Sequence, residues 1–225
     1  MKTETLARLR AARAGRQSVA RVMALDGSVD AVVEDGDGPL PETVLELARA
    51  ALKHNRSYDF EHEGARWFVQ AFNPPLRLVV VGAVHISQPL IRMAESLGYD
   101  VTLVDPRSAF ATAARFPGVT ISDEWPDDAL ETLDVDGRTA VVTLTHDPKL
   151  DDPALHVALR SEAFYIGALG SRRTHEKRAE RLAGAGFDEA AISRIHAPIG
   201  LDLGGRAPAE IALAIAAQMT EALYR

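Results

Sequence analysis

The stretch from Val79 to Ser87 has the layout of a turn that binds the phosphates of a nucleotide. Its valines predict a buried parallel strand, Gly82 supplies a tight turn, and the apolar spacing that follows predicts a helix. In the pattern GxGxxG the middle glycine lets a pyrophosphate approach the backbone, and here Val84 stands at that position. The stretch therefore predicts a helix N-terminus that faces an anion, but it disfavours the usual mode of NAD binding. His85, at the start of this helix, is placed to hydrogen-bond a ligand. A strand, turn and helix without a ligand is the alternative.

A carboxylate and a guanidinium follow the next predicted strand. Asp105 ends the apolar segment 101–104, about 20 residues after the turn, where a dinucleotide-binding fold places the acid that holds a ribose hydroxyl. Arg107 adds a guanidinium that suits a phosphate. The pair predicts a ligand site and does not choose between a ribose and a phosphate.

Further candidates stand where later strands are predicted to end. They are His146, Gly167, Gly170, Ser171, Arg172, Arg173, Asp202 and Gly204. Arg172 and Arg173 could clamp an oxyanion, although paired arginines on a helix also form an ordinary solvated face. His146 could act as a general base or a cofactor ligand, or it could belong with Asp147 to a local helix cap.

The elements that must position these residues begin at Leu76, where strands and helices start to alternate. Strands are predicted near residues 76–82, 100–105, 118–121, 139–145, 163–168 and 194–199. Alternation of this kind requires a mainly parallel sheet covered on both faces, an α/β doubly wound, Rossmann-like domain. Ligands of such sheets bind beyond the carboxyl ends of the strands, where all the candidate residues stand.

The first 75 residues have a different pattern. They predict a helix over 6–14, a hairpin of 19–24 and 31–33, a helix over 41–54, and a second hairpin of 57–61 and 65–72. Asn73, Pro74 and Pro75 then break the chain. We therefore expect a small α+β domain over 1–75 and the Rossmann-like domain over 76–225.

The final predicted helix, 208–223, is apolar on all sides over 211–217. Such a helix is normally enclosed by its own domain, and a homodimer face is the alternative use of the excess apolar surface.

Composition narrows the classes of function. The 225 residues include 25 basic and 32 acidic ones, and the net charge is −7. No basic stripe with interleaved aromatic residues is present, which argues against nucleic acid. The sequence shows neither the apolar core of a signal peptide nor an apolar run of about 20 residues, so we expect no membrane association and a cytoplasmic location. The chain has no cysteine, which excludes disulfides, thiolate metal sites and sulfur carriage on this chain, and no other metal site is predicted.

Several of these motifs, in the same order, resemble the XdhC/CoxI family. They are FNPPLRL at 72–78, GAVHI at 82–86, VDPR at 104–107, YIGALGSRR at 165–173, HAPIGLDLG at 196–204 and PAEIA at 208–212. The resemblance covers about residues 72–218. It implies an accessory protein for xanthine dehydrogenase and related molybdenum hydroxylases, which binds the molybdenum cofactor (molybdopterin), protects it during sulfuration by a cysteine desulfurase, and inserts it into the apo-enzyme.

The chain departs from this family in two respects. Longer members carry an N-terminal segment with glycine-rich and cysteine-containing motifs, which the first 75 residues lack, so either a separate chain supplies that segment or this protein does part of the work. Without a cysteine, sulfur must pass directly from a partner to the bound cofactor. The expected protein is a holder of the cofactor, a chaperone more than an enzyme, and no catalytic residue is assigned.

The expected binding mode places the cofactor's phosphate, or its nucleotide extension, at the Gly82 helix start and the Gly170 turn. The two arginines would neutralise it, His85 would orient the ligand, and the acids Asp105 and Asp202 would accept hydroxyl or pterin N–H groups. Two other functions stay open: an NAD(P)- or FAD-dependent oxidoreductase that uses His146 as proton donor, and a protein adaptor whose nucleotide pocket is vestigial.

Overall fold

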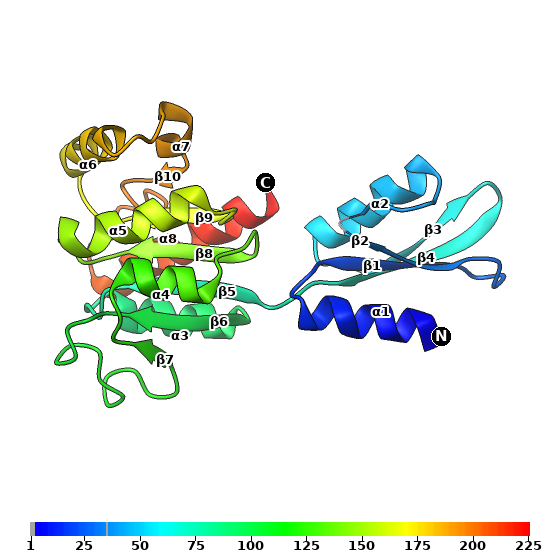
Figure 1. The fold of residues 1–225 in the computed structure, drawn as a ribbon, viewed down its shortest axis with the longest axis horizontal. Helices are drawn as coiled ribbons and strands as arrows, with labels where there is room; N and C mark the ends of the chain where they lie inside the picture. The colour runs from blue at the N-terminus through cyan, green and yellow to red at the C-terminus, as the bar shows by residue number, and fades with distance from the viewer. Residues whose placement is uncertain (1–2, 35) are drawn as a thin grey trace. The chain divides into compact units, whose positions relative to one another are not determined.

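The computed structural model describes residues 3–34 and 36–225. The chain divides into two compact units, one up to Pro74 and one from Pro75 to Leu223. The first is coloured blue to cyan and the second green to red in Figure 1.

The first unit is a four-stranded antiparallel sheet with helices. Its elements are α1 (Thr3–Ala14), β1 (Val19–Ala24), β2 (Asp30–Glu34), α2 (Glu42–Lys53), β3 (Tyr58–His62) and β4 (Ala65–Phe72). Both predicted hairpins are present, and β1 pairs with β4 to join them in the order β2-β1-β4-β3. The apolar side of α2, including Val44, Ala48 and Leu52, packs with Val22 and Val69 of the sheet.

The second unit carries the alternating strands and helices. Its elements are β5 (Leu76–Val81), α3 (Ser87–Ser96), β6 (Tyr99–Val104), β7 (Thr120–Ser122), α4 (Pro126–Leu133), β8 (Thr139–Thr143), α5 (Pro148–Arg160), β9 (Tyr165–Ala168), α6 (Arg172–Gly184), α7 (Glu189–Ser193), β10 (Ile195–His196) and α8 (Pro208–Tyr224). The strand order is β10-β9-β8-β5-β6-β7, and every adjacent pair is parallel. The predicted Rossmann-like fold, preceded by a small antiparallel sheet, is confirmed.

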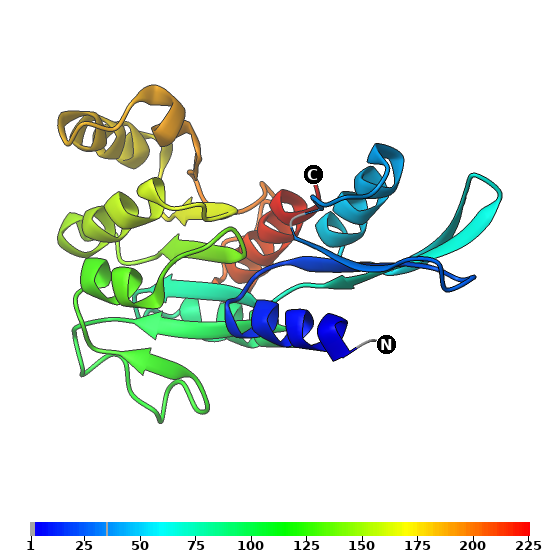
Figure 2. The same ribbon diagram turned by 45° about the vertical axis from the view of Figure 1, so that its right-hand side comes forward.

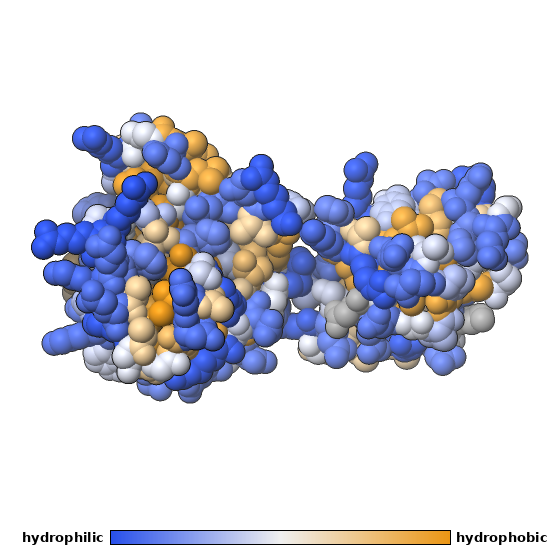
Figure 3. Space-filling view, turned by 90° about the horizontal axis from the view of Figure 1, so that it is seen from above, coloured by the Kyte–Doolittle hydropathy of each residue, from blue (hydrophilic) through white to orange (hydrophobic). Residues whose placement is uncertain are grey.

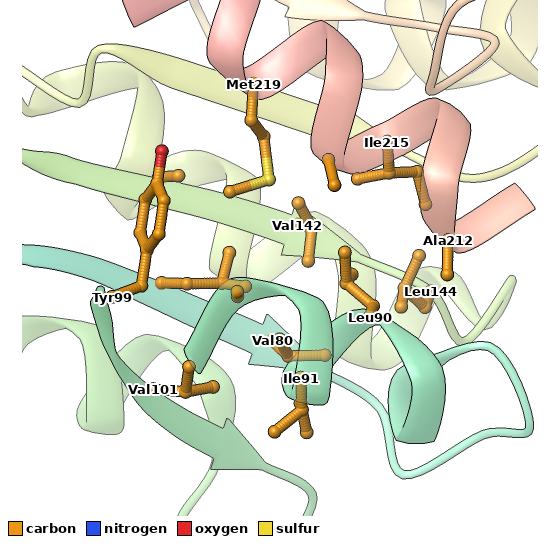
Figure 4. Packing of buried hydrophobic residues seen from close by; sticks show 14 of the residues in the cluster. Val80, Leu90, Ile91, Tyr99, Val101, Val142, Leu144, Ala212, Ile215 and Met219 are labelled. Carbon is orange, nitrogen blue, oxygen red and sulfur yellow. The ribbon is translucent and has the colours of Figure 1, made fainter. Parts of the chain in front are cut away.

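The side chains of the central strand β5 show which helices cover each face of this sheet. Alternate side chains of a strand point to opposite faces. Leu78 and Val80 therefore join the core beneath α3 and α8, whereas Val79 and Val81 join the core beneath α4 and α5. Figure 2 shows these helices on the two sides of the sheet, and Figure 4 shows α3 and α8 side chains meeting the strands.

The last helix, α8, packs on the sheet as its apolar sequence predicts. Ala212, Ile215 and Met219 are buried in the core of this unit, whereas Leu213 remains 54% exposed. Within the described ranges 3–34 and 36–225, no helix has both the length and the apolar character needed to span a membrane.

Strand β10 is shorter than the 194–199 predicted for it. It pairs with β9 only through Ile195 and His196. Pro198 follows closely and has no N–H to donate to a ladder, which limits the strand. The half-buried His196 ring stacks on Tyr165, with 4.7 Å between ring centroids, so it packs with the core as expected.

Candidate functional site

The strand order reverses at β5, which has β6 on one side and β8 on the other. In a sheet of this kind the connections diverge at the reversal and leave a crevice beyond the carboxyl ends. These ends point to the left in Figure 1, toward the loops that carry the candidate residues.

Gly82 lets the β5 turn approach the β8 loop closely. Its φ is +110°, and a Cβ at this position would lie 2.6 Å from Thr145 Cγ2. An L side chain would be strained by this backbone conformation and would also collide with Thr145. The glycine is therefore required by the local packing of the turn, whether or not a ligand binds there.

The first amides after Gly82 are already engaged by the protein itself. The Ala83 N–H donates to Asp105 Oδ2 at 2.8 Å, and the Val84 N–H donates to Ser87 Oγ at 3.3 Å. The Ser87 hydroxyl in turn donates to the Gly82 carbonyl at 2.5 Å. These two amides are therefore not free to bind a phosphate at this turn. His85, by contrast, is exposed on the turn.

Asp105 stabilises the Gly82 turn by a hydrogen bond from the Ala83 amide. Its side chain is fully buried and accepts hydrogen bonds from Arg107 Nε and Nη2, both at 2.8 Å, besides the Ala83 amide. Burial acts to raise the pKa of Asp105, but the hydrogen bonds from Arg107 and from the amides outweigh it and leave the pKa below its usual range. Both carboxylate oxygens of Asp105 are therefore used in hydrogen bonds within the protein. Arg107, which is 39% exposed, is the member of the pair that faces outward.

The depressed pKa of Asp105 predicts a pH dependence of stability. Its contribution should be complete above the unfolded-state pKa of about 3.9 and should be lost as the pH falls through the lower folded-state pKa. We therefore expect the difference in unfolding free energy between the native protein and Asp105→Asn to shrink between about pH 5 and pH 3. Urea titrations at a series of pH values measure it, and a constant difference would contradict the ion pair.

The β8 loop holds His146 in an unusual conformation. Thr145 Oγ1 donates to Asp151 Oδ1 at 2.7 Å and accepts from the Asp147 N–H at 3.0 Å, while Asp147 caps α5 by accepting from the Lys149 N–H. Between these fixed points His146 has φ +61°, in the left-handed region, and its side chain is exposed. The loop therefore presents the imidazole outward at a conformational cost of about 1–2 kcal/mol.

Two replacements of His146 test this strain. We expect the free energy of unfolding of His146→Gly to lie within about 1 kcal/mol of that of the native protein, because glycine accepts this conformation but loses more entropy on folding. His146→Val should be at least about 1 kcal/mol less stable than His146→Gly, because a β-branched residue is disfavoured there. Denaturant unfolding compares them, and equal stabilities would contradict the strain.

The loop after β9 leads into α6. Gly167 leaves room for Ile199 Cδ1, which would lie 2.5 Å from a Cβ, and Gly170 takes φ +141° against Thr174. Ser171 is the N-cap of α6 and accepts from the Thr174 N–H at 3.2 Å. The glycines thus shape the loop by packing, and they direct the first turn of α6 toward the end of β8.

A pocket of about 360 Å³ lies between these two loops. Its lining residues are His146, Pro148, Asp151, Ser171, Arg173, Thr174, Lys177, Arg178 and Arg181. Four of them are basic and one is acidic, so the lining carries an excess of positive charge. Hydrophilic side chains project from the end of this unit at which α6 lies (Figure 3).

Arg178 is the unexpected member of this lining. Its side chain is only 2% exposed, and Nη2 donates to the Leu169 carbonyl at 2.9 Å. Nε and Nη1 have no hydrogen-bond partner among the described residues, nor has Oδ2 of Asp151, which lies 3.9 Å from Nη2. Desolvation lowers the pKa of Arg178, and the buried neighbour Asp151 has a raised pKa for the same reason.

The pocket separates the predicted residues into groups. His146, Ser171 and Arg173 line it, whereas Arg172 is exposed and outside the lining. Asp202 and Gly204 line a second pocket of about 280 Å³, formed by the loop after β10 and the start of α8. Lys177 and Arg178 were not predicted. Leu182 could have indicated that Arg178 is buried. Residues four apart share one face of a helix, and Arg178 stands one turn before this buried leucine.

The second unit matches a known family over nearly its whole length. The family described as the XdhC Rossmann domain matches residues 78–219. A probable xanthine dehydrogenase subunit from Bacillus subtilis (strain 168) is 27% identical over 190 residues, which are 84% of this chain and 54% of that protein. The molybdenum cofactor insertion chaperone PaoD of Escherichia coli (strain K12) is 30% identical over 152 residues, 68% of this chain and 42% of PaoD. The chain thus spans about half the length of these relatives.

The fold as a whole is also similar to that of a solved structure. A crystal structure described as a xanthine dehydrogenase from Bacillus halodurans superposes with a TM-score of 0.67 at 24% identity, covering 98% of this chain and 64% of that one. At this identity the likeness shows the fold alone.

Proposed function

This chain belongs to the XdhC family, and from that membership we propose that it binds the molybdenum cofactor and helps its maturation and insertion into a molybdenum hydroxylase of the xanthine dehydrogenase type. The relatives named for xanthine dehydrogenase and for cofactor insertion support this role. The observation in the structure that carries the proposal is the basic pocket at the carboxyl ends of β8 and β9.

The residues of this pocket fit a cofactor that has an anionic end and polar ring edges. Arg173 and Lys177 are exposed cations on one side of α6, and Ser171 and Thr174 offer hydroxyl groups at the start of the helix. His146 stands across from them on the β8 loop and can hydrogen-bond a ring edge. When inserted in its target enzyme, the molybdenum cofactor supplies the redox centre; this chain's residues would bind it and shield it.

The Gly82 turn has a supporting part in this proposal. Its first two amides are held by Asp105 and Ser87, and the turn packs against Thr145, the neighbour of His146. Arg107 and His85 are the residues on this side of the β8 loop whose side chains reach the surface. We assign ligand contacts on this side to them, and a positioning role to Asp105.

The two neighbouring arginines provide a test of the binding site. Arg173→Ala should weaken binding of the cofactor by about 1.5–3 kcal/mol, or about 10–150-fold, because a charged hydrogen bond to the anionic end is lost. Arg172→Ala removes the same charge from outside the lining and should weaken binding at least about fivefold less. Fluorescence titration with molybdopterin measures both, and equal losses would contradict the orientation of α6 in the site.

The absence of cysteine shapes the expected handling of sulfur. None of the 225 residues can carry a persulfide. A cysteine desulfurase would therefore act directly on the bound cofactor, and the apo-hydroxylase would then receive it. In this scheme the residues of the basic pocket bind the cofactor, and the desulfurase and the apo-hydroxylase act on it in turn.

Mass spectrometry of the protein isolated from molybdenum-replete cells tests the function as a whole. We expect molybdopterin, or its nucleotide form, to copurify and to activate an apo-hydroxylase when the two proteins are mixed. A stable complex with the apo-hydroxylase and no bound small molecule would identify an adaptor instead, and would contradict the proposal.

An oxidoreductase with NAD(P) or FAD is the competing function. Val84, which stands where the GxGxxG pattern has its middle glycine, argues against a pyrophosphate at the Gly82 turn, where such cofactors bind. Titration with NADH, followed by its fluorescence, separates the two functions, because tight binding of NADH would favour the oxidoreductase.

A further inference from the structure

We propose that the pocket beside α6 contains a preformed binding site for a phosphate monoester, centred on the buried guanidinium of Arg178. The inference rests on the proposed function only for the identity of the natural ligand, which would be the phosphate end of the cofactor. It assigns that phosphate to the β9–α6 side of the sheet, away from the Gly82 turn.

The protein's own groups already engage part of the anion-binding capacity of the Gly82 turn. The first two amide N–H groups that follow the glycine already donate to Asp105 and Ser87. Asp105 also carries a negative charge that its depressed pKa maintains. A phosphate that used these two amides would have to displace their partners and would lie near the Asp105 carboxylate, so the turn is a poor site for it.

Arg178, by contrast, has unsatisfied hydrogen-bonding capacity. Among the residues that the structure describes, Nε and Nη1 find no acceptor, although the side chain is only 2% exposed. Buried N–H groups without an acceptor are costly, and guanidinium N–H groups match phosphate oxygens in pairs. The Nη2 bond to the Leu169 carbonyl fixes one end of the group and leaves Nε, Nη1 and the second N–H of Nη2 to donate to a ligand.

The charges around Arg178 also favour an anion. Arg173 and Lys177 line the same pocket, and Arg181 is paired with Asp152 at 2.5 Å. Asp151 opposes Arg178, but at 3.9 Å the two do not form a hydrogen bond, and the carboxylate already accepts from Thr145. The remaining positive charges exceed the one acidic group, so the pocket attracts a negatively charged ligand.

The lining combines one buried cation with exposed cations. Arg173 and Lys177 are long, exposed side chains on successive turns of α6, whereas Arg178 is buried among the lining groups. A phosphate would reach Arg178 by movement of these flexible chains and would then be held between fixed and mobile cations. The Ser171 and Thr174 hydroxyls hydrogen-bond each other at 3.0 Å, and the one that accepts this bond can donate its own hydrogen to the same anion.

Titration calorimetry with inorganic phosphate tests the site directly, at an ionic strength held constant with sodium chloride. We expect the native protein to bind phosphate and Lys177→Ala to bind it at least tenfold more weakly. Lys149→Ala removes an exposed positive charge from the first turn of α5, outside the pocket lining, and should stay within twofold of the native protein. Arg178→Lys keeps the charge but loses the paired donors, and should also bind at least tenfold more weakly.

The outcomes separate this site from the proposed function. Absence of phosphate binding in the native protein, or equal affinities for Lys177→Ala and Lys149→Ala, would overturn the site even if Arg178→Lys does not fold. Binding of molybdopterin that phosphate does not displace would also overturn it, while the chaperone function would stand. Binding of phosphate without any binding of molybdopterin would support the site and remove the function.

Discussion

Replacing Asp105 by alanine is expected to lower the free energy of unfolding by about 3 kcal/mol, at the lower end of the cost of breaking a buried ion pair. The carboxylate is fully buried, and its removal leaves the Ala83 N–H and the guanidinium of Arg107 without their acceptor. Since Arg107 is 39% exposed, water can satisfy part of its charge, and this limits the loss.

Asp100→Ala provides the matched control, because Asp100 is an exposed aspartate on β6, the strand that Asp105 directly follows. It should change stability by no more than about 0.5 kcal/mol. Urea unfolding at pH 7 measures both variants. A loss below about 1 kcal/mol for Asp105→Ala would show that the carboxylate does not hold the turn, and would return Asp105 to the residues available for a ligand.

Replacing Ile215 by alanine should cost about 2–5 kcal/mol, the range for truncating a buried aliphatic side chain. Ile215 is completely buried between α8 and the sheet, and it packs in the same core as Leu90 and Val142 (Figure 4). The variant should also loosen the loop after β10, because the Ala214 carbonyl, one residue before, accepts the Leu201 N–H at 3.1 Å.

Leu213→Ala removes the same kind of side chain from the exposed side of α8, where 54% of Leu213 is accessible. Its effect should stay within about 0.5 kcal/mol. Thermal or urea unfolding compares the two variants. Comparable losses would mean that Leu213 is covered by another protein surface in solution, which is the homodimer face that the all-apolar sequence of this helix left open, and sedimentation at micromolar concentration would then detect the dimer.

Much of the fold could be predicted because the relevant patterns are local. Runs of β-branched residues between helical periods identify the parallel strands, and Gly82 identifies a turn at the end of the first of them. In a parallel sheet every strand ends at the same edge, so naming the strand ends was enough to name His146, Ser171 and Arg173, which the structure brings into one pocket. The pairing of β1 with β4 was not predictable in this way, because it joins residues distant in sequence.

The sequence by itself determined which segments form strands and helices, and at which edge of the sheet the polar residues gather. Only the tertiary structure decided what each of those residues does there. Arg172 and Arg173 are neighbours in sequence, but successive residues of a helix point about 100° apart, so the packing of Leu182 and Arg178 selects which arginine faces the pocket. In the same way Asp105 belongs to the turn because folding places Ala83 and Arg107 within hydrogen-bond distance of a carboxylate that water no longer reaches.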